Sequence, residues 1–329
     1  MRPRLIRVIQ CLFTCPVAGN LSTRMTAGQS SGLSERPFSP VSNRLALGTA
    51  QFGLPYGIAN TRGQMGQEEA AAVLRVAAAA GIDTLDTAIS YGESEVVLGR
   101  IGVSGWKVIS KLPGLGANSD PQSWVSEAVS ASLGRVGISQ FHGLLLHRPK
   151  DLFGPAGSAL LEAIGNAKDQ GFTAKVGVSV YRPEELESIW RVFRPDLVQF
   201  PLSILDRRFI TSGWLSRLAA EGVETHARSV FLQGLLLMDS GRRPPTFRRW
   251  QPLWQRWEDW LVEASIGPLR ACLGFALAHS ELDRILVGVD GLTQLEELLS
   301  GVDGRPIYPP DNLVSEDPDL LNPSNWKRS

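Results

Sequence analysis

The stretch Gly-Ile-Asp-Thr-Leu-Asp-Thr-Ala-Ile-Ser-Tyr, residues 81–91, decides the fold of this chain. Its apolar run near 82–85 stops at Asp86, and Tyr91 follows after a short loop. A short apolar run bounded by a glycine and by polar residues predicts a buried strand. The strand therefore carries two chemically active side chains at its carboxyl end.

Two further apolar runs end in the same way. The run 106–110 stops at Lys111, and the run 141–146 stops at His147. Because parallel strands of one sheet end on the same side, we expect these groups to meet the carboxylate and the phenol of residues 81–91. Taken singly, each residue has a structural explanation, such as a turn cap, a half-buried aromatic ring or a solvated strand end. Together they predict a proton donor with the groups that tune it.

The rest of the chain repeats this strand-then-helix pattern. Strands are expected near residues 44–47, 82–85, 106–110, 141–146, 174–178, 196–200, 223–227 and 284–288. Helices are expected near 67–80, 94–101, 121–136, 158–171, 183–193, 212–221, 266–280 and 292–300. Eight such units predict an α/β fold of parallel strands that closes into a (β/α)8, or TIM, barrel. The alternative, an open doubly wound sheet, is disfavoured because no glycine-rich dinucleotide loop follows the first strand.

The pattern divides the chain into three parts. Residues 1–43 are predicted to be a disordered extension, or the product of a mis-assigned start with Met25 as the true one. Polar residues and a proline interrupt their apolar stretch, which disfavours a signal peptide. Residues 44–304 form the single barrel domain, and residues 305–329, rich in Pro, Asp and Asn, are expected to be irregular.

Composition excludes several classes of function. Lys plus Arg and Asp plus Glu both number 33, so no net charge attracts nucleic acid or an anionic membrane. No run reaches the roughly 20 apolar residues that a membrane helix needs. The three cysteines are scattered and the histidines lack ligand spacing, so we expect no disulfide framework and no metal site. This pattern suits a cytoplasmic protein.

From about Arg44 to Gly301 the chain resembles an aldo-keto reductase. The matching segments are Leu47–Gly53, Gly81–Ala88, Tyr91 with Gly92, Lys111, His147, Gly177–Ser179, Ser229 with Gln233–Leu235, and Gly288 with Gln294–Glu297. Their order and spacing agree with the family along most of the chain. The run Ala-Arg-Ser-Val-Phe-Leu-Gln-Gly, residues 227–234, is similar to a bacterial branch associated with surface-polysaccharide pathways.

The resemblance implies reduction of an aldehyde or ketone, with Tyr91 as the acid. Carbonyl reduction needs a hydride on carbon and a proton on oxygen, and a tyrosine with a pKa near ~10 holds its proton at neutral pH. A cation at Lys111 would ease release of that proton, because it stabilises the phenolate. Asp86 would keep Lys111 charged, and His147 would hydrogen-bond the carbonyl oxygen.

The resemblance also implies a bound NAD(P)H, because no side chain donates hydride. The positions that match the family's cofactor contacts are Gly48, Thr49, Ser179, Gln199, Arg228, Ser229, Gly288, Asp290 and Gln294. Ser179 and Gln199 would hold the carboxamide, Gly48 and Thr49 would line the nicotinamide ribose, and Ser229–Gly234 would clasp the pyrophosphate.

Departures from the family pattern bear on cofactor choice. Val180 stands where the family often has Asn, and Arg228 stands at the often aromatic stacking position. Relatives that prefer NADPH often hold its 2′-phosphate with basic residues, whereas this chain has Asp290 and Gln294. We therefore expect NAD(H) or dual use. The alternative is that the basic segment 242–249 supplies the missing charge.

The substrate and the partners are less defined. Tryptophans at 250, 254, 257 and 260 have helical spacing and predict either a helix packed on the barrel or an apolar wall for a sugar ring. The expected partner is a small-molecule carbonyl or sugar substrate. With the arginines of segment 242–249, the tryptophans suggest an anionic sugar or a nucleotide-sugar. The alternative functions are a non-catalytic, cofactor-binding regulatory subunit and a glycoside hydrolase. A glycoside hydrolase would need a second carboxylate at a strand end beside Asp86, and the sequence offers no convincing one. No pattern in the sequence defines the oligomeric state.

Overall fold

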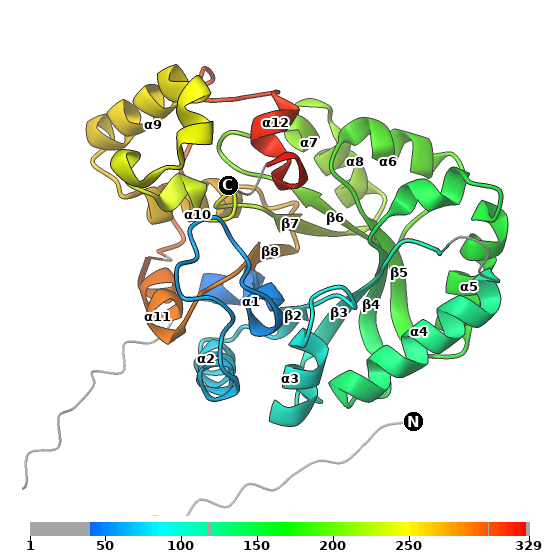
Figure 1. Ribbon diagram of the computed structural model, residues 1–329. Coiled ribbons are helices and arrows are strands. Elements are labelled where there is room, and N and C mark those ends of the chain that lie inside the picture. The colour runs from blue at the N-terminus through cyan, green and yellow to red at the C-terminus, as the bar shows by residue number, and fades with distance from the viewer. Residues whose placement is uncertain (1–39, 117–119, 302, 327–329) are drawn as a thin grey trace, which may run out of the picture. The chain divides into compact units, whose positions relative to one another are not determined.

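Eight parallel strands pair in chain order and close into a barrel, as the computed structural model shows (Figure 1). The structure describes residues 40–116, 120–301 and 303–326. The strands are β1 (Leu45–Gly48), β2 (Thr84–Asp86), β3 (Lys107–Leu112), β4 (Phe141–Leu146), β5 (Thr173–Ser179), β6 (Leu197–Pro201), β7 (Glu224–Arg228) and β8 (Arg284–Val287). The predicted (β/α)8 barrel is therefore confirmed.

At least one helix follows each strand along the chain, and α12 lies in the carboxyl-terminal segment. The helices are α1 (Ala50–Gly53), α2 (Gln67–Ala79), α3 (Ser94–Ile101), α4 (Pro121–Val136), α5 (Gly157–Asp169), α6 (Pro183–Trp190), α7 (Arg208–Thr211), α8 (Trp214–Ala220), α9 (Gln251–Glu263), α10 (Pro268–Leu277), α11 (Leu292–Gly301) and α12 (Pro318–Leu321). Short 3₁₀ helices are η1 (Pro40–Arg44), η2 (Pro149–Phe153), η3 (Leu235–Leu237), η4 (Ser240–Arg242), η5 (Pro245–Trp250) and η6 (Pro323–Asn325).

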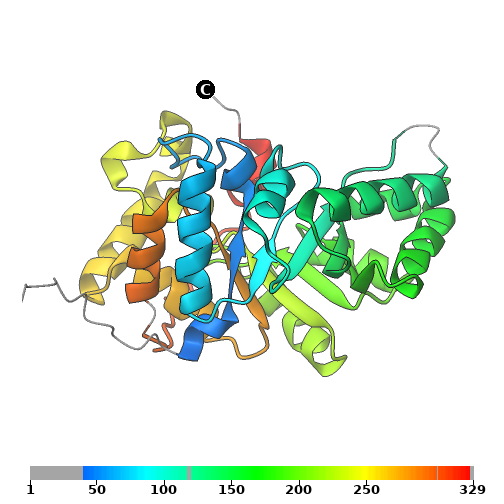
Figure 2. The same cartoon turned by 90° about the horizontal axis from the view of Figure 1, so that it is seen from below.

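Closure of the barrel depends on the pairing of its first and last strands. Leu45 lies in register with Ile285, and Leu47 with Val287. The helices next to this seam, α2 and α11, lie side by side in both views (Figures 1 and 2). Ala70, Val73, Leu74 and Ala77 form the buried face of α2.

Helix ends follow the local signals of the sequence. Asp120 caps α4 by accepting a hydrogen bond from the Ser123 backbone N–H at 2.9 Å, and Pro121 occupies its first turn. Gly137 ends the same helix in the left-handed conformation, with φ of 73°. The sequence therefore fixes both bounds of α4.

The barrel interior is built in layers. Side chains two residues apart on a strand share a face, so Ile109 lies below Lys111, Leu145 below His147, and Leu197 below Gln199. Ile109, Leu145 and Leu197 form their own buried apolar cluster. It separates the polar groups at the carboxyl ends of the strands from those at the amino ends.

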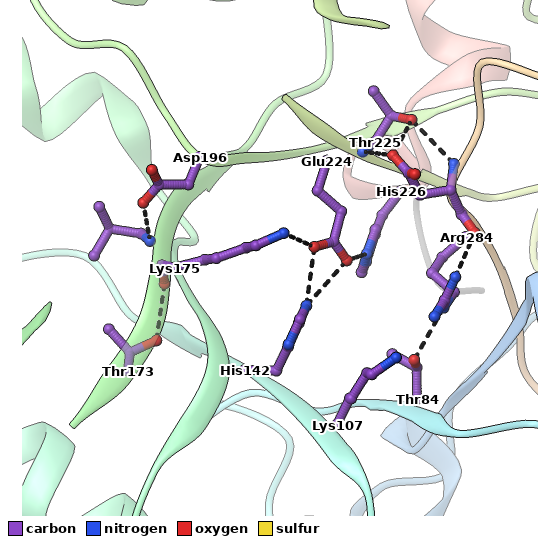
Figure 3. A network of polar contacts seen from close by, with 12 residues as sticks. Thr84, Lys107, His142, Thr173, Lys175, Asp196, Glu224, Thr225, His226 and Arg284 are labelled. Atoms are coloured by element: carbon purple, nitrogen blue, oxygen red, sulfur yellow. Dashed lines mark hydrogen bonds and ion pairs between the residues drawn. The ribbon is translucent and has the colours of Figure 1, made fainter. Parts of the chain in front are cut away.

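A polar network occupies the amino ends of the strands (Figure 3). Its centre is Glu224, the first residue of β7, whose carboxylate accepts hydrogen bonds from His142 Nε2 at 2.9 Å and His226 Nε2 at 2.7 Å. Lys175 forms an ion pair with the same carboxylate. Residues at this end of such barrels usually serve stability, and we assign this network to that role.

The segment between β7 and α10 packs on the barrel through α9 (Figure 1). Trp254 and Trp257 of α9 are each only 1% exposed. The interpretation of the tryptophans as a packed helix is thus correct for these two residues, and the interpretation as a sugar-binding wall is wrong for them. Arg243 lies 4.7 Å from the Trp254 ring and pairs with Glu258 at 2.6 Å.

The carboxyl-terminal segment packs against η5, where Trp326 meets the Phe247 ring edge to face at 5.0 Å. The segment contains α12 and η6. Arg249 pairs with Asp317 at 2.8 Å and with Asp319 at 3.0 Å, so its charge is already neutralised. Leu320 and Leu321 are buried. The prediction for residues 1–43 falls outside the described residues, except for 40–43 at the start of η1.

Within the described residues, no single helix has the length and apolar composition to cross a bilayer. The segments Pro245–Glu263 and Pro268–Leu277 meet those criteria only as a pair, and they are bent by 89° relative to each other.

Candidate active site

A buried ion pair forms the base of the site at the carboxyl ends of β2 and β3. Lys111 Nζ lies 2.6 Å from Asp86 Oδ1, and it also donates to the Thr87 carbonyl at 2.8 Å. Gln199 of β6 donates to the other carboxylate oxygen of Asp86 at 2.7 Å. Because both charged side chains are almost fully buried, this pair persists only with such geometry and such additional hydrogen bonds.

Tyr91 and His147 lie above this pair. Lys111 Nζ is 5.0 Å from the centroid of the Tyr91 ring, and the rings of Tyr91 and His147 meet edge to face at 6.0 Å. Ser90 Oγ lies 3.3 Å from His147 Nδ1. Neither the Tyr91 hydroxyl nor His147 Nε2 has a hydrogen-bond partner among the described residues. Two unpartnered groups at one cavity suit a carbonyl oxygen.

The protonation states of these groups differ in part from the expectation. Burial, followed by the charge of Asp86, raises the pKa of Tyr91 above its usual value of 10, whereas Arg228 opposes the rise. We expected Lys111 to lower it, but the hydrogen bonds of Lys111 are directed to Asp86 and the Thr87 carbonyl. Burial, followed by the charges of Lys111 and Arg228, lowers the pKa of His147 to about 4. Tyr91 is therefore protonated and His147 neutral at pH 7.

These groups open into a cavity of about 700 Å³, within the size range of small-molecule and cofactor sites. Every predicted site residue lines this cavity except Thr49 and Lys111. Lys111 lies behind the Asp86 carboxylate. The Thr49 hydroxyl is fully buried and donates to the Asp86 carbonyl at 3.0 Å, so it braces β1 against β2.

An amide and a hydroxyl line the cavity beside the ion pair. Ser179, the last residue of β5, and Gln199 of β6 lie in register, with Ser179 Oγ 3.4 Å from Gln199 Oε1. Because the Gln199 amide nitrogen donates to Asp86, the orientation of the amide is fixed, and its oxygen accepts from the Ser179 hydroxyl. This arrangement suits a ligand amide.

The loop after β7 carries unusual backbone conformations. Ser229, Leu232 and Gln233 have positive φ angles of 63°, 49° and 54°, and Gly234 follows with 87°. Such strain in non-glycine residues concentrates at functional sites. A Cβ at Gly234 would lie 2.5 Å from Ala59 Cβ, so only glycine fits where this loop meets the loop after α1.

The far end of the cavity is formed by the loop after β8. Gln294 Oε1 accepts from the Asp290 backbone N–H at 2.7 Å. Burial raises the pKa of Asp290, and hydrogen bonds from Gln294 and Gln51 oppose this. Arg62 donates to the Asp290 carbonyl at 3.2 Å and pairs with Glu69 at 2.9 Å. Asp290 and Arg62 therefore lie together at this end of the cavity.

Sequence reasoning missed several residues that line the cavity. Of the four tyrosines in the chain, Tyr56, Tyr91 and Tyr181 all line it. Tyr181 lies two residues beyond Ser179, so attention to strand ends could have found it. Tyr56 and Arg62 lie in a loop that follows no strand directly, and no pattern in the sequence marks them. Within the described residues, no group of three potential metal ligands is present.

The comparisons with known proteins agree with this geometry. The profile of the Aldo/keto reductase family matches residues 44–303. A putative aldo-keto reductase from Pseudomonas aeruginosa is similar in structure, with 19% identity, a TM-score of 0.59, and coverage of 81% of this chain and 93% of that chain. The holo form of aldo-keto reductase AKR11C1 from Bacillus halodurans has 20% identity, a TM-score of 0.63, and coverage of 80% and 88%. No curated protein matches the chain in sequence.

Proposed function

Because the chain belongs to the aldo/keto reductase family, we propose that it is an NAD(P)H-dependent oxidoreductase that reduces an aldehyde or ketone to an alcohol. The observation that carries the proposal is the buried Asp86–Lys111 pair beneath Tyr91 and His147 at the cavity. The Tyr91 hydroxyl and His147 Nε2 are the two groups there that lack a partner within the described residues.

In this proposal, Tyr91 gives the proton to the carbonyl oxygen. Burial keeps the hydroxyl protonated until the oxygen begins to take negative charge. The Lys111 ammonium, held by Asp86 near the ring, stabilises the phenolate that remains. Neutral His147 donates a hydrogen bond that positions the oxygen toward Tyr91. General acid catalysis of this kind typically contributes ~10²–10⁴-fold.

The residues around the cavity fit a nicotinamide dinucleotide. When bound, it would supply the hydride. Ser179 and Gln199 would hold the carboxamide, because they present a hydroxyl and an oriented amide side by side. The strained segment Ser229–Gly234 would hold the pyrophosphate through its backbone N–H groups. Gly48 and Gly288 also line the cavity, and a Cβ at Gly288 would lie 2.8 Å from Gln51 Nε2.

We propose NAD(H) or dual use, because the Asp290 carboxylate would repel a 2′-phosphate and accept a hydrogen bond from a ribose hydroxyl. Arg62 does not reverse this, since Glu69 neutralises it. In the segment 242–249, Arg242 lines the cavity, whereas Arg243 and Arg249 are engaged in ion pairs elsewhere.

The substrate proposal is a small carbonyl, including one derived from a sugar. Its support is the run 227–234, which is similar to bacterial members near surface-polysaccharide pathways. A cytoplasmic location accords with Cys272, a buried free thiol. The assignment of a sugar-derived substrate depends on this similarity in sequence.

Turnover tests the proposal. Oxidation of NADH and NADPH would be followed at 340 nm with a panel of aldehydes, ketones and aldoses, and binding of each cofactor by fluorescence. We expect turnover of at least one carbonyl class. Tight cofactor binding without turnover across the panel would instead favour a regulatory subunit, and absence of cofactor binding would refute both.

A further inference from the structure

Arg228 brings a positive charge into the catalytic end of the cavity. It is the last residue of β7, is half-buried and lines the cavity. Its guanidinium lies 4.1 Å from the centroid of the Tyr181 ring and donates to the Val180 carbonyl at 3.0 Å and to Ser229 Oγ at 3.3 Å. These contacts hold the guanidinium plane in place beside the ends of β5 and β7.

Nothing in the described part of the chain neutralises this charge. Lys111 is paired with Asp86, and Arg62 with Glu69, but no carboxylate among the described residues lies within ion-pair distance of Arg228. The two hydrogen bonds use two of its five N–H groups, which leaves three available. A half-buried charge without a counter-ion is unfavourable, so this position favours an anionic ligand.

Arg228 faces the same space as the proposed proton donor. Its charge opposes the rise in the pKa of Tyr91 and, after burial and Lys111, contributes to the lowered pKa of His147. Tyr181, on which the guanidinium stacks, lines the cavity with them. An anion bound by Arg228 therefore lies close to the reacting carbonyl.

We propose that Arg228 binds a carboxylate of the substrate, so that the preferred substrates are carbonyl compounds with a carboxylate close to the carbonyl. A guanidinium presents N–H groups in a planar fork that matches a carboxylate. This inference rests on the proposed function, since it names the substrate class of the same site. A cofactor phosphate is the competing source of the anion, and the experiment separates the two.

The kinetic test uses substrate pairs that differ only in charge. They are phenylglyoxylate with its methyl ester, and pyruvate with methyl pyruvate, in each of which the carboxyl group is bonded to the carbonyl carbon. We expect the wild type to prefer the carboxylates in kcat/KM, and Arg228→Gln to reduce that preference about 10- to 100-fold. Arg228→Lys, which keeps the positive charge, should retain part of the preference for the carboxylates. Arg242→Gln removes an exposed arginine of the same cavity and serves as the matched control, with an unchanged preference.

Binding supplies a readout that does not need turnover. Titration calorimetry would compare benzoate with neutral benzamide on the cofactor-free protein. We expect Arg228→Gln to weaken benzoate at least about 10-fold and to leave benzamide unchanged. Equal weakening of both would show that Arg228 only shapes the pocket, and would overturn the proposal.

Two further outcomes separate this inference from the proposed function. If Arg228→Gln weakens NADH binding and leaves the substrate preference intact, the anion is a cofactor phosphate and the inference is wrong. If benzoate binds through Arg228 and no carbonyl is reduced with either cofactor, the carboxylate site stands and the reductase proposal fails.

Discussion

The replacement Glu224→Gln tests the polar network at the amino ends of the strands (Figure 3). The carboxylate is 12% exposed and accepts hydrogen bonds from fully buried His226 and from His142, in addition to the Lys175 ion pair. Breaking a buried charged pair costs roughly 3–5 kcal/mol. Because Lys175 is 36% exposed, solvent screens its share, and we expect a loss of about 3 kcal/mol.

This loss should be visible in thermal unfolding followed by circular dichroism. For domains of this size, about 1 kcal/mol corresponds to roughly 2 °C, so the Tm of Glu224→Gln should fall by about 6 °C. Asp83→Asn serves as the matched control, because it removes a carboxylate at the same end that is 43% exposed, and it should lower the Tm by less than about 2 °C. A Glu224→Gln protein that melts within about 1 °C of the wild type would show that the Glu224 carboxylate does not stabilise the fold.

The same network predicts a pH dependence. Burial alone raises the pKa of Glu224, but hydrogen bonds from His142, His226 and Lys175 outweigh burial and hold it below its usual value. A carboxyl group whose pKa is lowered in the folded state stabilises the fold above its unfolded pKa, near ~4.3, and loses that contribution as the pH falls. The Tm difference between wild type and Glu224→Gln should therefore be largest at pH 6–7 and shrink below pH ~4. A difference that grows on acidification would contradict this.

Three further predictions concern the site. Lys111→Met should lower kcat at least about 100-fold and should destabilise the fold, because it leaves Asp86 buried and unpaired. Adding Asp86→Asn to this variant should restore the Tm but not kcat. Because the pKa of His147 is about 4, kcat/KM for a neutral ketone should show no step near pH 6.5, and a pH–rate profile with such a step would assign His147 a different environment. Gly234→Val should weaken cofactor binding at least about 10-fold in a fluorescence titration, because its φ of 87° and the 2.5 Å approach to Ala59 Cβ exclude a side chain.

The strands were predictable because a strand buried on both faces reads as a continuous apolar run. The run that stops at Lys111 became β3 (Lys107–Leu112), and the run that stops at His147 became β4 (Phe141–Leu146). Strand ends then placed the polar groups on one rim. To predict that these groups lie at one end of the barrel, one needs only the parallel order of the strands and no other long-range contact.

The site residues that could not be predicted from the sequence lie in loops. Tyr56 reaches the cavity because its hydroxyl accepts from Gln233 Nε2 at 3.1 Å, a contact between residues 177 positions apart. No local periodicity encodes such a meeting. For the tryptophans of α9, helical spacing predicted the helix correctly. It could not tell whether their side chains form a buried face or a cavity wall. The burial of Trp254 and Trp257, each only 1% exposed, separates the two.

Tyr91→Phe shows whether Tyr91 donates the proton, because it removes one hydroxyl and leaves the Asp86–Lys111 pair in place. The measurement is oxidation of NADH and NADPH at 340 nm with the best carbonyl of the panel, with cofactor binding to the same protein followed by fluorescence. We expect kcat to fall by about 10²–10⁴-fold while cofactor affinity stays within about twofold. Turnover by Tyr91→Phe at the wild-type rate would contradict this expectation, because the proton would then come from another group.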